Sequence, residues 1–160
     1  MLVLGIGNDI MGDDAVGLRV ARMLRDEWPM ADIQESYSLG LDLLDLLDGY
    51  ACVLLLDSIV TYAYTPGTIL EIHEAEIRQH GRISPHHAGI AESLEVAKIL
   101  QIPLPLKLTV LAMEVSDPFH FRVGMSPAVE AALPAMAEKA RELLAEWLAE
   151  PMPEKPTILA

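Results

Sequence analysis

Acidic side chains that follow short apolar runs are the residues of this chain whose types and spacing could do chemistry. The segment LGIGNDIMGDDAVG, residues 4–17, places Asp13 and Asp14 after an apolar run and a glycine-rich turn. Asp57 follows a continuous apolar run at residues 51–56. Ligand sites of open α/β sheets lie at the carboxyl ends of strands, where carboxylates can bind a cation or act as a base. Asp14 and Asp57 are therefore candidate site residues.

A structural role competes with chemistry at each of these positions. Asp13 stands at the head of a helical pattern, where N-capping and the helix dipole favour acids, and capping is the commoner role for such a residue. For Asp57, capping of the next turn and membership of a site weigh about equally. These residues alone leave both roles open.

Histidines supply the candidate nitrogen donors. Ser84-Pro85-His86-His87 reads as a loop that leads into a helical pattern ending at Leu100, and a histidine at a helix entrance can aim a ring nitrogen outward. A lone histidine is more often structural or solvated, and His73, His80 and His120 are assigned that role. Nothing in the spacing separates His86 from the others.

Several common catalytic and cofactor motifs are absent from the sequence. A dinucleotide-binding G-x-G-x-x-G would need glycine at Ile10, and no G-K-[ST] phosphate loop is present. The chain has neither an H-E-x-x-H zinc helix nor a G-x-S-x-G nucleophile turn. Asp57-Ser58-Ile59 also differs from the Asp-Thr/Ser-Gly of pepsin-like proteases. The sequence therefore lacks the motifs of the common zinc, serine and paired-aspartate proteases.

Hydrophobic periodicity predicts the elements that position these residues. Strands are expected at residues 1–6, 32–37, 51–56, 68–73 and 104–115, and the alternation at 68–73 is typical of an edge strand. Helices are expected from Asp13 to a stop at Trp28 and Pro29, over 39–47, after the histidine loop, and after an N-cap at Ser126, with connections at 75–82 and 116–122. This order predicts an α/β three-layer sandwich whose doubly wound, mostly parallel sheet has about five strands, one of them antiparallel.

Length and composition predict one domain at residues 1–150 and an unstructured proline-rich tail at 151–160. No apolar run approaches the roughly 20 residues of a membrane span, so we expect a cytoplasmic protein without membrane insertion. The net charge of −13 argues against nucleic acid as a partner and suits a basic protein segment, although solubility explains it equally well. The single cysteine, Cys52, is interpreted as a buried apolar residue.

Four blocks of the sequence together resemble the hydrogenase maturation proteases, which remove a C-terminal extension from the large subunit of nickel-iron hydrogenases. They are the opening LGIGNDIMGDDAVG, LLLDSIV at 54–60 with PGTI at 66–69, SPHHAGIAESL at 84–94, and GMSPAVEAALP at 124–134. The blocks occur in the family's order along most of the chain. One departure is residues 35–38, Glu-Ser-Tyr-Ser, where the family usually carries Asp-Gly-Gly-Thr.

The resemblance implies roles for three residues. It assigns Asp14, Asp57 and His86 as the metal-binding and catalytic set, with glutamate at the first position in some members. Two carboxylates and an imidazole can hold a divalent first-row metal, and nickel is compatible with that set. In the family picture the nickel is carried by the precursor.

The expected function is therefore that of a nickel-dependent endopeptidase acting on a nickel-iron hydrogenase large-subunit precursor. A non-catalytic nickel-sensing chaperone that holds the precursor is the alternative, and a small-molecule enzyme that uses the strand-end cleft is a third, weaker one. Either Asp13 or Asp57 could serve as the general base.

Overall fold

The computed structural model of the chain describes residues 1–37, 40–79, 85–116, 121 and 123–151. The side chains of residues 78–79 and 85–88 lie outside that description. The elements in chain order are β1 (Leu2–Ile6), the short 3-10 helix η1 (Gly12–Ala15), α1 (Val16–Leu24), β2 (Asp32–Ser36), α2 (Asp42–Leu47), β3 (Cys52–Ile59), β4 (Ile69–His73), α3 (Glu74–Gln79), α4 (Pro85–Leu100), β5 (Lys107–Glu114) and α5 (Pro127–Ala149).

Five strands form one sheet in the order β2-β1-β3-β5-β4. The pairs β1–β2, β1–β3 and β3–β5 are parallel, and β4 pairs antiparallel with β5 at one edge. Every residue of β1 and β3 is buried, as expected for central parallel strands covered on both faces. The predicted sheet, with its single antiparallel edge strand, is confirmed.

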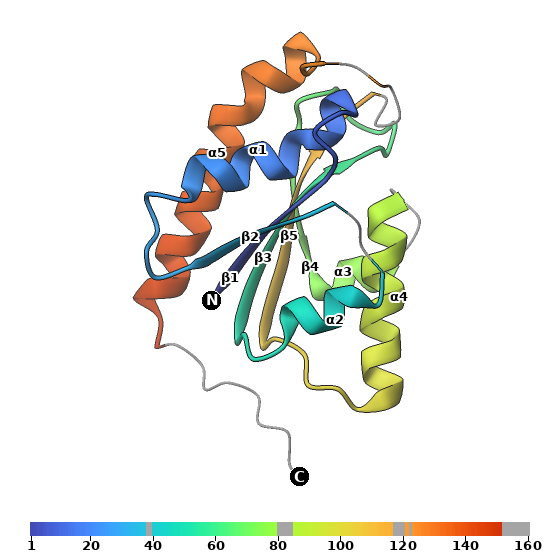
Figure 1. Cartoon of the computed structure of the whole chain (residues 1–160), viewed down its shortest axis with the longest axis vertical. Coiled ribbons are helices and arrows are strands. Elements are labelled where there is room, and N and C mark those ends of the chain that lie inside the picture. The colour runs from blue at the N-terminus through green and yellow to red at the C-terminus, as the bar shows by residue number, and fades with distance from the viewer. Residues whose placement is uncertain (38–39, 80–84, 117–120, 122, 152–160) are drawn as a thin grey trace.

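Helices cover both faces of the sheet, which gives three layers (Figure 1). One core lies between the sheet and helices α1 and α5, with Val20, Leu24 and Trp147 among its buried side chains. The other core includes Leu43 of α2 and Leu94 of α4. Hydrophobic burial on both sides therefore fixes the sheet between its helices. No helix within the described ranges is long and apolar enough to cross a membrane.

Several predicted boundaries were wrong. The first helix ends at Leu24, before Trp28 and Pro29, and a helix, α3, occupies most of residues 75–82 because Ile77 is buried in the second core. Helix α2 begins at Asp42 rather than at residue 39, which is itself outside the description. The predicted loop at 116–122 and the tail after Pro151 fall mostly outside it too. The domain boundary at residue 150 stays a prediction.

Candidate functional site

The carboxyl ends of the parallel strands meet at one edge of the sheet, at the top of Figure 1. From β1 the chain builds outward to β2 and then returns to place β3 on the other side of β1, so the direction of winding reverses between β1 and β3. Ligands of open α/β sheets bind beside such a reversal. Asp14 follows β1 and Asp57 lies near the end of β3, so both predicted carboxylates belong to the strands that flank it.

Two glycines let the chain after β1 pack closely against the strand ends. Gly7 has a φ of 145°, and a Cβ on it would lie 1.9 Å from the backbone oxygen of Asp14. A Cβ on Gly17 would lie 2.1 Å from the backbone oxygen of Leu56 in β3. Only glycine fits at these positions, and the glycines of the opening segment therefore determine where Asp14 sits.

Asp14 contacts the strand that carries Asp57. Its side chain is buried, and its Oδ1 accepts a hydrogen bond of 3.1 Å from the Ser58 hydroxyl. Ser58 follows Asp57 in β3 and also donates its backbone N–H to Asp57 Oδ1 at 2.8 Å. One serine thus orients both carboxylates, a role that the sequence analysis missed.

Asp57 lies inside β3 and not after it, which corrects the predicted strand end. Parallel pairing of β3 with β5 continues from Asp57↔Ala112 to Ile59↔Glu114, so the strand runs three residues beyond its predicted end at Leu56. Side chains alternate along a strand, and Asp57 therefore shares the sheet face of Leu55 and Ile59, which pack in the core that α4 covers. Its side chain is fully buried.

His86 lies in the first turn of α4, because this helix begins at Pro85 and not after the histidines as predicted. The body of α4 packs on the same sheet face that Asp57 occupies, through Ile90 and Leu94. The side chains of His86 and His87 are outside the described set, and no group of three potential metal donors occurs among the side chains that are described. The set of Asp14, Asp57 and His86 therefore stays a prediction.

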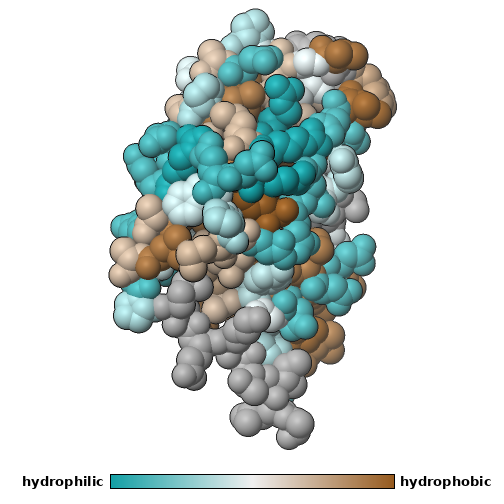
Figure 2. Space-filling model, turned by 60° about the vertical axis from the view of Figure 1, so that its left-hand side comes forward, coloured by the Kyte–Doolittle hydropathy of each residue, from teal (hydrophilic) through white to brown (hydrophobic). Residues whose placement is uncertain are grey.

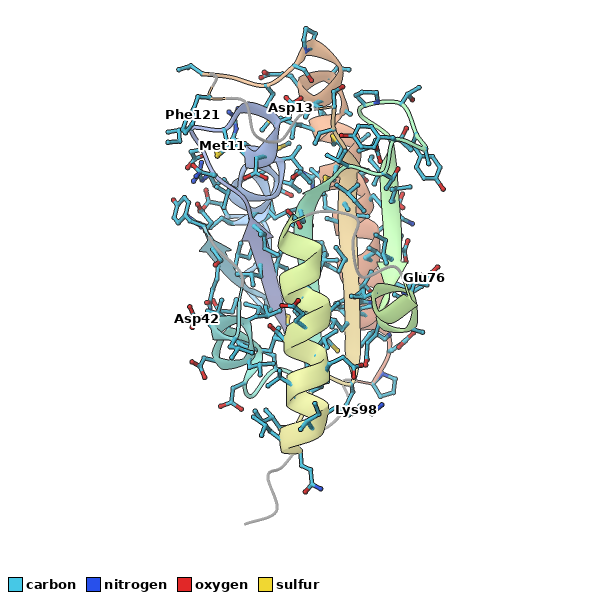
Figure 3. The ribbon with its side chains drawn as sticks, turned by 90° about the vertical axis from the view of Figure 1, so that its right-hand side faces the viewer. Met11, Asp13, Asp42, Glu76, Lys98 and Phe121 are labelled. Carbon is cyan, nitrogen blue, oxygen red and sulfur yellow. The ribbon has the colours of Figure 1, made fainter. Side chains whose placement is uncertain are left out.

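Asp13 joins two elements across the edge. Its Oδ1 accepts the backbone N–H of Ser126 at 2.5 Å, and Ser126 is the residue that precedes α5. The carboxylate lies at the positive end of the α5 dipole, which favours a negative charge. Asp13 therefore supports the start of α5 rather than capping the helix after β1 as predicted, and Ser126 holds the expected N-cap position without a side-chain cap bond. In Figure 3, Asp13 and Met11 lie at the same end of the molecule as Phe121.

A further buried carboxylate, which the sequence analysis missed, is that of Glu114, which ends β5 beside β3. Its Oε1 accepts the backbone N–H groups of Thr61 and Tyr62 at 2.8 and 2.9 Å, and its Oε2 accepts the Thr61 hydroxyl at 2.7 Å. These three bonds hold the Glu114 carboxylate against residues 61–62, which follow β3. The sequence signal was only an acid at the end of an apolar run, as for Asp57.

An ion-pair network braces the segment between β1 and η1 from the outside. Arg22 of α1 binds both oxygens of Asp9 at 2.7 Å and also bonds Glu35 of β2, which Arg25 contacts too. Hydrogen bonds from Arg22 hold the pKa values of Asp9 and Glu35 below their usual range and raise the pKa of its own guanidinium. The network ties the glycine-rich segment to the second strand.

Cys52 stands at the opposite end of β3 from Asp57. Its side chain is buried, and burial raises the pKa of its thiol, which disfavours the reactive thiolate. Its interpretation as a buried apolar residue is confirmed.

Comparison with known proteins identifies the fold and the family. A family model described as hydrogenase maturation protease matches residues 21–143. The chain belongs to the hydrogenase maturation protease family. It is 28% identical over 160 residues to the hydrogenase 2 maturation protease of Escherichia coli strain K12, covering 97% of this chain and 96% of that one.

Two solved structures extend the likeness of this maturation protease. The hydrogenase maturating endopeptidase HybD from E. coli superimposes with a TM-score of 0.79 at 28% identity, over 91% of both chains. The hydrogenase 2 maturation peptidase from Thaumarchaeota archaeon SCGC_AB-539-E09 gives a TM-score of 0.62 at 28% identity, over 90% of this chain and 97% of that one. The protein is therefore a hydrolase, an endopeptidase of the hydrogenase maturation type.

Proposed function

We propose that this maturation protease removes the C-terminal extension of a nickel-iron hydrogenase large-subunit precursor, and that it requires nickel already held by the precursor. Asp14, Asp57 and His86 would contact that metal. The observation that carries the proposal is the buried Asp57, oriented at the end of a central strand by the serine that also binds Asp14.

The donor set fits a divalent cation. Asp14 and Asp57 offer carboxylate oxygens at the reversal between β1 and β3, and α4, whose first turn contains His86, packs on the sheet face that Asp57 shares. Such a donor set is compatible with a first-row metal such as nickel. A bound nickel ion would polarise the scissile carbonyl or lower the pKa of a water molecule.

The residues of the chain supply orientation and a base. Ser58 holds the two carboxylates by separate hydrogen bonds, so their positions do not depend on the substrate. Asp13 is bound to the start of α5 through Ser126. Because that bond ties Asp13 to a second element and Asp57 lies on the sheet face that α4 covers, we assign the proton from water to Asp57 rather than to Asp13.

Intact-mass spectrometry of the precursor tests the proposal. The expected result is loss of a single C-terminal peptide when the nickel-loaded precursor is incubated with the protease. A stable complex with a precursor of unchanged mass would instead support the chaperone that the sequence also allowed. Asp57→Asn, run in parallel, shows whether the cleavage depends on this site.

A further inference from the structure

The segment between β3 and β4, residues 60–68, contains a strained and highly exposed tyrosine. Tyr62 has a φ of 58°, and its side chain is 87% exposed. A bulky residue in the left-handed region is a conformational outlier that the surrounding structure must hold in place. Such strain concentrates at ligand-binding and active sites.

Glu114 holds both ends of this segment. Its carboxylate accepts the N–H groups of Thr61 and Tyr62 and the hydroxyl of Thr61. Its backbone oxygen accepts the Gly67 N–H, and its own N–H donates to the Thr68 oxygen, each at 2.8 Å. The two tied ends leave Tyr62 and Tyr64, the latter 53% exposed, to point their rings into solvent from a fixed base.

The segment lies next to the candidate site. Tyr62 follows Asp57 by five residues, which an extended chain spans in at most about 17 Å. Residues 60–68 contain no charged side chain, in a chain with a net charge of −13. Exposed hydrophobic side chains also occur after the other parallel strands at this edge, including Ile10 and Phe121, and Figure 2 shows hydrophobic residues at this upper end of the molecule.

We propose that Tyr62 and Tyr64 bind an uncharged stretch of the precursor polypeptide beside the scissile bond, with Glu114 as the positioning residue. The inference rests on the proposed function, because an endopeptidase must hold an extended chain across its site. Tyrosine rings provide rigid contact area, and their hydroxyl groups can bond to the backbone of such a chain. Because residues 60–68 are neutral and include aromatic rings, they should bind a neutral stretch of polypeptide more tightly than a charged one.

The decisive variant is Tyr62→Gly, which removes the ring and keeps the left-handed backbone accessible. The matched control is Gln101→Gly, because Gln101 has a φ of 56° and follows α4 at the far end of the molecule. With purified nickel-loaded precursor as the substrate, Tyr62→Gly should raise KM about tenfold or more and leave kcat within about twofold. Gln101→Gly should change neither constant, and neither variant should lower the thermal midpoint.

Glu114 variants separate positioning from general stability. Glu114→Ala should raise KM as Tyr62→Gly does, and Glu114→Gln, which keeps an oxygen for the Thr61 and Tyr62 N–H groups, should restore most of it. A lowered thermal midpoint in Glu114→Ala with an unchanged KM would reduce this residue to a structural role and overturn its part of the proposal.

Other outcomes distinguish this inference from the function on which it rests. Equal processing by the parent protein and Tyr62→Gly overturns the inference and leaves the function standing. A change in oligomeric mass in Tyr62→Gly, with processing intact, would show that the segment contacts a second copy instead. If the parent protein binds the precursor without cutting it, the endopeptidase proposal fails. Weaker binding of the precursor by Tyr62→Gly would then still support the proposed contact with Tyr62 and Tyr64. A parent that neither binds nor cuts overturns both.

Discussion

Asp57 is an acidic residue whose side chain is completely buried near the end of the central strand β3. Asp57→Asn retains the shape and an oxygen for the Ser58 N–H, so it removes the charge with little else. We expect processing to fall by about 100-fold or more and nickel binding to weaken, with no loss of thermal stability because a buried amide is less costly than a buried charge. Asp14→Glu, which conserves the charge, should keep nickel binding.

Calorimetric titration with nickel and a cleavage assay measure both effects. Asp45→Asn on the outer face of α2 removes an exposed aspartate and serves as the control. An unaltered nickel affinity in Asp57→Asn would show that the metal binds elsewhere.

His86 and its neighbour His87 provide a second test at the residue scale. Adjacent residues of a helix point about 100° apart, so only one of them can face the carboxylates. The family resemblance selects His86, and we expect His86→Ala to abolish processing while His87→Ala keeps most of it. The comparison is made with the same precursor and equal enzyme concentrations. Equal damage from the two substitutions would contradict the assignment.

Among the elements, α1 joins the glycine-rich segment to β2 through Arg22. Hydrogen bonds from Arg22 lower the folded-state pKa values of Asp9 and Glu35. A carboxyl group whose pKa is lower in the folded protein than in the unfolded chain stabilises the fold at pH values above its unfolded pKa of about 4. That stabilisation is lost as the pH falls through the pKa of the folded state. Arg22→Met should therefore lower the free energy of unfolding by about 1 kcal/mol at pH 7, a modest amount because the pairs are partly exposed.

Urea unfolding of the parent and of Arg22→Met over a range of pH checks this sign. The difference between them should be constant from pH 7 to about 5 and shrink below about pH 4. It should also shrink in 1 M salt, which screens exposed charges. A difference that grew as the pH fell would contradict the role of the network.

The order of elements was predictable because hydrophobic period and glycine breaks are local signals. The exact extent of β3 was not, because its last residues are set by pairing with β5, more than 50 residues away in the sequence. Helix α3 was missed for a related reason: its residues are mostly polar, and the burial of Ile77 against the sheet that helps to stabilise it is a tertiary contact. Tertiary contacts decided both cases.

The placement of Asp14 and Asp57 near the carboxyl ends of two strands was predictable from the sequence, and their role stays a prediction. The position of Asp14 follows from the glycines around it, and Asp57 follows its apolar run. Three hydrogen bonds were not predictable, because each joins segments that only the folded sheet brings together. They link Ser58 to Asp14, Ser126 to Asp13, and Thr61 to Glu114. The left-handed backbone of Tyr62 carried no sequence signal, because the residue is not glycine or asparagine.

At the scale of the whole molecule, helices on both faces leave the loops at the carboxyl edge to display the residues that the strands position (Figure 1). Three buried aspartates and one buried glutamate gather in or beside these strand ends. The family comparison identifies the chain as an endopeptidase, and this edge is the proposed place of its site. The role of nickel, the identity of the precursor and the cytoplasmic location remain predictions.

Intact-mass spectrometry of the same large-subunit precursor, with and without its nickel, tests the central claim most directly. The protease should remove one C-terminal peptide from the nickel-loaded form and leave the nickel-free form at full length. Efficient cleavage of the nickel-free precursor in the presence of a chelator would contradict the account.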